Sequence, residues 1–196
     1  MSGAFPLGSP NSINLRSVSP TRVSVSHSQK RQTRSSLSHR WAIKLNFANR
    51  IPFEYRQIEG FMDAQHGQAE TFTIVLPLYP LGTWLGSPVV NGAAQTGYTL
   101  NLRGFTASQM GVIKSGDIFK SANVAKVYRA VADANSDAGG LVAVTLNCQL
   151  VASPADGEAI TFSSVPFTVA NTSDNVETAL AAAIVGSMGL DLIEVP

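Results

Sequence analysis

Cysteine is nearly absent from this sequence. The single cysteine, Cys148, cannot form an intramolecular disulfide, so the fold does not depend on an oxidising compartment. Cys148 lies in an apolar run, where it alternates with Leu146 and Leu150, and no histidine motif accompanies it. This setting favours a small buried hydrophobic side chain over a nucleophile.

Charged residues and long hydrophobic runs are also scarce. Charged side chains make up 14% of the chain, and the formal net charge is +1. Such a surface favours an all-β structural protein covered by neighbouring subunits over a strongly solvated monomer. No apolar run approaches the roughly 20 residues of a membrane span. The N-terminus has no contiguous hydrophobic region like that of a secretory signal, so we expect a soluble intracellular product.

Motifs for catalysis, phosphate binding and metal binding are missing as well. We find no P-loop, dinucleotide fingerprint or nucleophile elbow. The segment from Asp133 to Asp137 begins like a Ca²⁺ loop, but Ala138 replaces the required glycine and Val144 the required glutamate. The histidines are scattered and lack a third metal ligand: His27, His39 and His66. We therefore predict no enzyme activity and no catalytic, cofactor-binding or metal-binding residues.

The clearest pattern present is strand, helix, strand. From Ser38 to Phe47, polar and apolar residues alternate at period two, as in a half-buried strand. From Phe53 to His66, the apolar residues Phe53, Ile58, Phe61 and Met62 lie close to one helical stripe. Pro52 suits a helix start, and Gly67 suits a left-handed stop. An extended run from Glu70 to Leu76 follows. We predict that these elements form the core of a domain.

The segments that flank this core have weaker patterns. Residues 1–12 are rich in Gly, Pro and Ser and predict an extended arm with little to pack. We predict short strands at 12–18 and 21–27, and a polar, basic loop at 29–36. Near the C-terminus, 189–195 alternates well enough for a final strand. Residues 179–185 are compatible with either helix or strand.

After Pro77 the chain becomes rich in turn-forming residues, and short strands then recur at regular spacing. This spacing, without a helical pattern, indicates a small β-barrel or sandwich. The predicted strands are 98–102, 118–119, 124–130, 142–148 and 159–162.

The strand–helix–strand segment resembles tail proteins of tailed bacteriophages. The shared features are Arg40-Trp41, the alternating strand, the Pro52-Phe53 helix with Phe61, then Gly67 and Phe72. They are similar to the distal tail or tail-hub component, whose relatives have a tail-tube type of fold. The resemblance covers about residues 29–78, with weaker similarity at 89–97, 115–119 and 153–169. None of these residues is catalytic, so the resemblance is one of architecture.

The resemblance implies a mainly β fold: a β-sandwich or barrel of tail-tube type with one short helix, plus an inserted small β-barrel module. The expected domains are an arm at 1–12, a ring-forming β domain at 13–85 plus 175–196 with its helix near 53–65, and a module at 86–174. The implied function is a virion structural protein that forms a ring at the tail end and joins the tube to baseplate or fibres.

The resemblance also implies the partners. We expect a homo-oligomeric ring, a hexamer, in contact with tube, baseplate hub and fibre proteins. DNA would pass through the lumen without specific binding, and no membrane is involved. The expected location is the virion tail, after assembly in the host cytoplasm.

Basic residues are concentrated in the first part of the chain. Residues 1–56 contain nine of the 14 Lys and Arg and one acid. Phosphate binding by Lys30, Arg31, Arg34 and Arg40 is one interpretation. No aromatic platform accompanies these residues, so contact with an acidic patch on the next subunit is favoured. The candidate interface residues are Lys30, Arg31, Arg34, Tyr79 and Trp84.

Two alternatives are kept. A carbohydrate-binding module for host adhesion would stack sugars on Trp84, Tyr79 and Tyr98, and the exposure of these rings in the assembled state would test it. A head–tail connector or tube subunit would share most of the expected properties. A peptidoglycan hydrolase is disfavoured because the carboxylate pair is missing.

Overall fold

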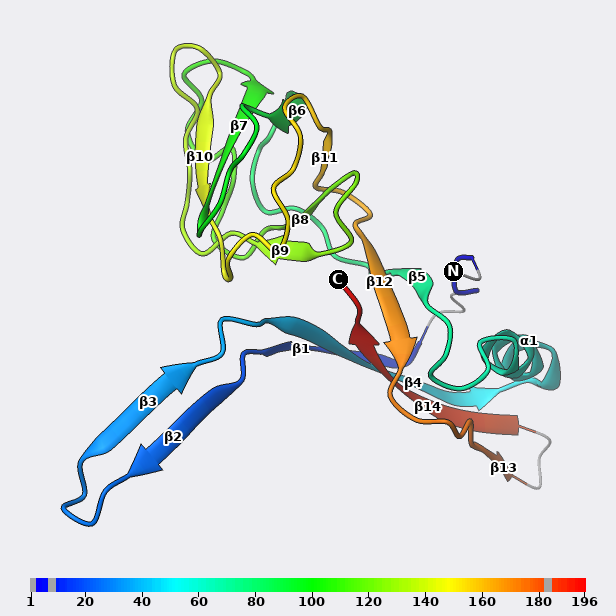
Figure 1. Cartoon of the computed structure of the whole chain (residues 1–196). Helices are drawn as coiled ribbons and strands as arrows, with labels where there is room; N and C mark the ends of the chain where they lie inside the picture. Colours follow the sequence, from blue (N-terminus) through cyan, green and yellow to red (C-terminus); the bar gives the residue numbers. More distant parts are fainter. Residues whose placement is uncertain (1–2, 7–9, 182–184) are drawn as a thin grey trace. The chain divides into compact units, whose positions relative to one another are not determined.

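The computed structural model describes residues 3–6, 10–181 and 185–196 (Figure 1). By its contacts the chain divides into two compact units. The first unit is drawn from residues up to 19, from 39–74 and from 168–195. The second comprises 20–38, 75–167 and Pro196. The fold is mainly β with one described helix, as predicted, and the described sheets are open, which fits a sandwich-type fold.

One antiparallel sheet dominates the first unit, and β4 lies inside it (Figure 1). Its strands along the main path are β1 (Ser12–Val18), β4 (Arg40–Arg50), β14 (Val185–Glu194), β12 (Pro166–Asn171) and β5 (Phe72–Val75), and β13 (Thr178–Ala181) pairs with β14. Ile43 pairs with Leu15 on one side and Leu192 on the other. The alternation in β4 buries Trp41, Ile43, Leu45 and Phe47, so the predicted central strand is confirmed.

Helix α1 (Pro52–Asp63) begins at the predicted proline. Its packed face is Tyr55, Ile58 and Met62. The predicted stripe was wrong at its start, because Phe53 is 70% exposed. Positions 55, 58 and 62 are spaced by three and four residues and share one face, whereas position 53 lies outside that stripe.

The N-terminal segment supplies a residue to the core of the first unit. Phe5 is buried, and its ring lies 5.5 Å from that of Phe61 and 5.9 Å from that of Phe72. Ala4 forms a parallel bridge with Thr73. The Gly-, Pro- and Ser-rich composition predicts little packing here, but one aromatic side chain is enough to hold this stretch against β5.

Two strands form a separate ribbon. Strands β2 (Thr21–Val25) and β3 (Arg31–Ser35) pair with each other, and every residue from 20 to 38 is exposed. We call residues 20–38 the ribbon (Figure 1). The sequence predicts a loop at 29–36, and this prediction was wrong. The strand gains its backbone partners from β2, and a polar pattern does not show such pairing.

The rest of the second unit, residues 75–167, is called the module. Its two three-stranded sheets are β10-β7-β6 and β11-β8-β9. The strands are β6 (Gly86–Val90), β7 (Thr99–Phe105), β8 (Ile118–Ser121), β9 (Val127–Arg129), β10 (Val142–Thr145) and β11 (Ile160–Thr161). A shared core contains Phe119, Tyr128 and Phe162. Cys148 is buried in this core, as predicted.

Within the described residues, no helix is long and apolar enough to cross a bilayer.

Candidate subunit interfaces

The ribbon carries four basic residues and no acidic residue. Its register places Arg22 directly opposite Arg34. Like charges in opposed positions destabilise a strand pair, because neither side chain neutralises the other. Open hollows lie on this part of the ribbon, and one of them, of about 310 Å³, is lined by Arg22, Arg34, Ser35 and Ser36. The pair of guanidinium groups is therefore suited to an anionic partner.

The other face of the ribbon is partly apolar. Side chains alternate between faces along a strand, so Val23 and Val25 lie opposite to Arg22. The two valines are 50% and 62% exposed. Val25 pairs with Arg31, which shares its face. An exposed ribbon with one cationic face and one mixed apolar face has surfaces that a protein neighbour can cover.

The structure brings the three predicted basic interface residues onto this one ribbon, but not onto one face. Arg31 and Arg34 lie in β3 on opposite faces, because they are three residues apart. Lys30 lies at the turn, where its backbone N–H donates to Ser26 Oγ at 3.2 Å. Sequence reasoning missed Arg22, the cross-strand partner of Arg34. Only the recognition of residues 31–35 as a strand could have found it.

An acidic surface lies at the C-terminal end of α1. The last turn of the helix contains Asp63 and no basic residue. Asp174 approaches the following turn, where its Oδ1 accepts a hydrogen bond from Gln68 Nε2 at 3.1 Å. The helix dipole adds partial negative charge at this end. We call Asp63 and Asp174 the acidic turn. Among the described residues, neither forms an ion pair with Lys or Arg.

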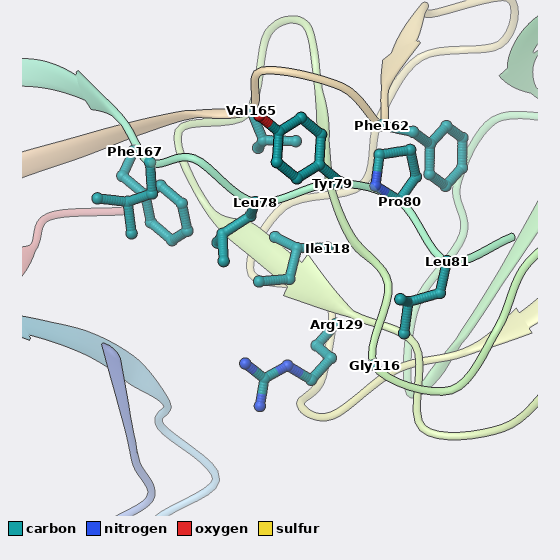
Figure 2. A pocket seen from close by; sticks show the side chains of 11 residues that line it. Leu78, Tyr79, Pro80, Leu81, Gly116, Ile118, Arg129, Phe162, Val165 and Phe167 are labelled. Atoms are coloured by element: carbon teal, nitrogen blue, oxygen red, sulfur yellow. The ribbon is translucent and has the colours of Figure 1, made fainter. Parts of the chain in front are cut away.

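A second exposed surface lies in the module and surrounds Tyr79 (Figure 2). Tyr79 is 85% exposed, and Leu81 is 65% exposed. A hollow of about 230 Å³ lies beside them. Its walls are mainly apolar and include Leu78, Ile118, Phe162, Val165 and Phe167. Arg129 also lines this hollow, and burial lowers the pKa of its guanidinium from the ordinary value.

Asp117 fixes the backbone that presents Tyr79 and Leu81. This carboxylate is 2% exposed. It accepts hydrogen bonds from the backbone N–H groups of Leu81, Gly82 at 3.0 Å and Lys114 at 2.7 Å. Gly82 is required here, because a Cβ atom would lie 2.3 Å from the carbonyl oxygen of Val112. The exposed rings and aliphatic groups are thus held on a rigid segment rather than on a loose loop.

The predicted aromatic residues do not share one environment. Trp84 is half-buried, and its ring lies 5.4 Å from that of Phe162 in the module core. Tyr79 projects from the surface, and Tyr98, in a different turn, is 43% exposed. A stacking role for the three rings in an assembled particle stays a prediction.

The loop that begins like a Ca²⁺ site uses its oxygens internally. Asp133 accepts hydrogen bonds from Lys114 Nζ at 2.7 Å and from the Ser115 N–H at 2.9 Å, and these bonds lower its pKa. Asp137 Oδ1 accepts from the N–H groups of Gly139 and Leu141, both at 2.8 Å. These bonds are typical of a structural turn. In the described part of the chain, no cluster of three or more His, Cys, Asp or Glu residues could hold a metal ion.

Comparison with known proteins finds a family match within the module. Residues 78–165 match the family model described as distal tail protein pb9, B domain. Among curated proteins, no match to the chain is found. The matched segment includes Tyr79, Trp84 and both sheets of the module. It lies almost wholly outside residues 29–78, the part that carries the resemblance in the sequence. The predicted resemblance to distal tail proteins of tailed bacteriophages is thus confirmed, and the match supports a structural protein of the phage distal tail.

Proposed function

We propose that this distal tail protein assembles into a homo-oligomeric ring, a hexamer, at the end of a phage tail. The ring would join the tube to baseplate or fibre proteins, and DNA would pass through its lumen without specific binding. The observation that carries the proposal is the ribbon: nineteen residues, 20–38, are all exposed, with opposed arginines on one face and valines on the other.

The proposed contact is electrostatic and pairs two copies of the chain. The ribbon of one subunit lies against the acidic turn of the next, so that Asp63 and Asp174 neutralise Arg22 and Arg34. Closure of such a head-to-tail contact by rotation produces a ring. Strand β1 lies at an edge of its sheet and offers further backbone groups to a neighbour.

The module supplies the proposed contacts to other tail proteins. Tyr79 and the hollow beside it are mainly apolar and rigidly held, which suits the centre of a protein interface. Trp84 would support this surface from the core side through Phe162. The sequence-based expectation was a ring-forming domain at 13–85 plus 175–196 and an inserted module at 86–174. Because the family match begins at 78, we propose that the insertion is the module, residues 75–167, rather than 86–174. Assembly in the host cytoplasm, without a membrane, completes the proposal.

Light scattering across a salt series tests ring formation, with the full chain alone and with a purified tail-tube partner. We expect a discrete oligomer whose mass falls toward that of a monomer as salt screens the contact. The variant Arg22→Glu/Arg34→Glu should stay monomeric. A chain that also carries Asp63→Lys and Asp174→Lys should regain the oligomer, because the exchanged charges again attract.

Two results would reject this contact. One is an oligomer that Arg22→Glu/Arg34→Glu leaves intact. The other is salt-sensitive binding of a DNA duplex that depends on the same two arginines, which would assign the ribbon to nucleic acid instead. Circular dichroism of each variant checks that its fold is retained.

A further inference from the structure

The outer face of sheet β10-β7-β6 carries polar side chains above a core-facing apolar layer. In β7, Asn101 is exposed while its neighbours Leu100 and Leu102 are buried. It pairs with Ala143 of β10, whose side chain is small and also exposed. On the other side, the N–H of Asn91 donates to the carbonyl oxygen of Asn101 at 2.9 Å. Two asparagines and an alanine therefore form a row across three adjacent segments.

Two side chains lock the loop beside this row. Gln95 Nε2 donates to the carbonyl oxygens of Asn91, Gly92 and Asn101 at 3.0–3.1 Å. Its Oε1 accepts from the Asn101 N–H at 2.7 Å. Asp156 accepts from the Gly92 N–H at 2.7 Å and from both terminal nitrogens of Arg103 at 2.8 and 3.2 Å. The backbone under the asparagines is thus fixed on the sheet, as a preformed site requires.

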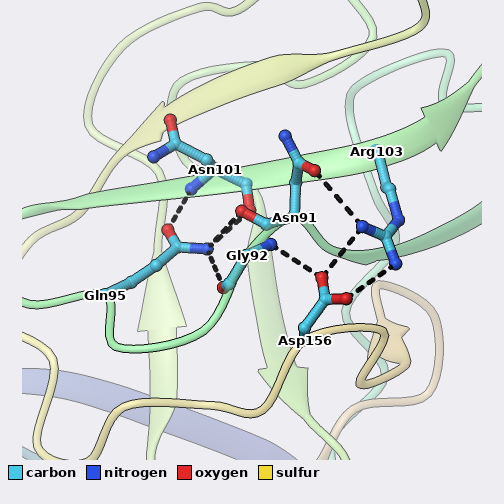
Figure 3. Close-up of polar contacts among 6 residues, drawn as sticks. All are labelled: Asn91, Gly92, Gln95, Asn101, Arg103 and Asp156. Carbon is cyan, nitrogen blue, oxygen red and sulfur yellow. Dashed lines mark hydrogen bonds and ion pairs between the residues drawn. The ribbon is translucent and has the colours of Figure 1, made fainter.

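The orientation of the Asn91 amide follows from its partner. Arg103 Nη1 lies 3.3 Å from Asn91 Oδ1, and a guanidinium can only donate, so the oxygen must face it. The NH₂ group of Asn91 is then directed away, as Figure 3 shows. In the described contacts, neither this NH₂ group nor the side-chain amide of Asn101 has a hydrogen-bond partner. Both amides are therefore available to a ligand.

A hollow of about 310 Å³ lies against this row. Asn91, Asn101 and Ala143 line it, together with Leu141 and Asp137. Leu141 is 41% exposed and supplies an aliphatic wall. Asp137 Oδ1 is occupied by two backbone N–H groups, which leaves Oδ2 as an acceptor. Donors, acceptors and an apolar wall thus surround one shallow space.

The charge balance of the site selects the class of ligand. Arg103 and Asp156 neutralise each other in a bidentate pair, and hydrogen bonds from Gly92 and Arg103 lower the pKa of Asp156. The free groups are neutral amides and one carboxylate oxygen, so they offer no positive charge to attract a polyanion. Hydroxyl groups both donate and accept, which matches this set. We propose that the hollow binds a neutral saccharide, with sugar hydroxyls bonded to Asn91, Asn101 and Asp137.

The proposal does not depend on ring formation and is tested on the chain in solution. Chitotetraose and maltotetraose serve as neutral probes, and a heparin tetrasaccharide serves as the anionic control. Titration is followed by ¹H–¹⁵N NMR of the side-chain amides. We expect one or both neutral probes to shift the Asn91 and Asn101 amide signals at millimolar concentration, while the heparin fragment leaves them in place.

Substitutions localise the binding. Asn101→Ala should weaken it at least tenfold, and Ala143→Gln, which fills the hollow without removing a polar group, should do the same. Asn14→Ala, an exposed strand asparagine of the first unit, is the matched control and should change nothing. The proposal is overturned if neither neutral probe shifts the NMR signals of the two side-chain amides, or if Asn101→Ala and Ala143→Gln both bind as well as the unaltered chain.

Discussion

The ribbon and the module are both built from short antiparallel strands, yet they are stabilised in different ways. The module has a shared apolar core and buried carboxylates, Asp117 and Glu158, that accept backbone hydrogen bonds. The ribbon has neither a buried residue nor an acidic partner for its arginines. An isolated two-stranded hairpin is marginally stable in water. The module is therefore stabilised by its own core, whereas the ribbon lacks buried contacts and, in the proposed function, would gain them from a neighbouring subunit.

The largest expected effect is in the module core. Phe119 is fully buried, and its ring lies 5.2 Å from that of Phe162 and 6.3 Å from that of Tyr128. Phe119→Ala should lower the free energy of unfolding by about 3–5 kcal/mol, because it removes a large apolar side chain and leaves a cavity. Chemical denaturation measures this change. A loss below about 1 kcal/mol would show that the module does not rest on this core.

The next largest loss of stability is expected on substitution of Asp117. Asp117→Asn replaces an acceptor-only carboxylate with an amide, so backbone N–H groups of Leu81, Gly82 and Lys114 compete for one oxygen. We expect a loss of about 1–3 kcal/mol in stability, together with faster proteolysis near Tyr79. Asp191→Asn, at an exposed ion pair with Lys44, is the control. If the two variants have equal stability, the buried carboxylate does not hold this segment.

The lowered pKa of the Glu158 carboxyl group leads us to predict that the stability of the fold depends on pH. Burial alone would raise its pKa, but hydrogen bonds from the Ser121 hydroxyl, the Asn123 N–H and the Ala155 N–H outweigh burial and lower it. A lowered folded-state pKa stabilises the fold above the ordinary value of 4.5, and this contribution is lost as pH falls toward the folded-state pKa. Glu158→Gln should therefore be less stable than the unaltered chain at pH 7.

The difference between Glu158→Gln and the unaltered chain should narrow as pH falls below 4.5. Thermal unfolding of both proteins between pH 3 and pH 7 measures it. Asp133 and Asp156 also have lowered pKa values, but both proteins contain them. Their pH-dependent contributions to the unfolding free energy therefore cancel in the comparison. A constant difference across this range would contradict the assignment to Glu158.

The smallest effect on subunit stability is expected in the ribbon. Arg34→Ala removes one of two opposed like charges, so the unfolding free energy of the monomer should change by less than about 0.5 kcal/mol. The same substitution should reduce the oligomer seen by light scattering. A marked loss of monomer stability would mean that the ribbon, like the module, is stabilised within the chain.

The sequence allowed prediction of elements whose stabilising partners leave a local pattern. The alternation in β4 and the proline before α1 are of this kind, and β1 was placed at its observed bounds. The predicted apolar face of the helix was wrong at Phe53, because apolar character alone does not show which side of the first turn faces the sheet. Cys148 was placed correctly in a core from its apolar neighbours.

Features that depend on pairing between distant residues could not be predicted. Strand β3 is polar along its whole length, so only its partner β2 defines it, and Arg22 was missed for the same reason. Asp117 and Asp156 resemble ordinary turn residues in the sequence, although each organises several backbone groups. The hollow proposed to bind a saccharide combines single residues from different segments, among them Asn91 and Asn101, and no spacing in the chain connects them.

Because Cys148 is buried in the module core, the reactivity of its thiol can report local opening of the module. It is the only thiol in the sequence, and it is 5% exposed within the module core. A thiol reagent reaches it only when the module opens, so the labelling rate in native buffer measures the free energy of local opening without any added probe. The same rate, recorded for the free subunit and for any oligomer that it forms, would show whether the proposed contact at the ribbon also stabilises the module.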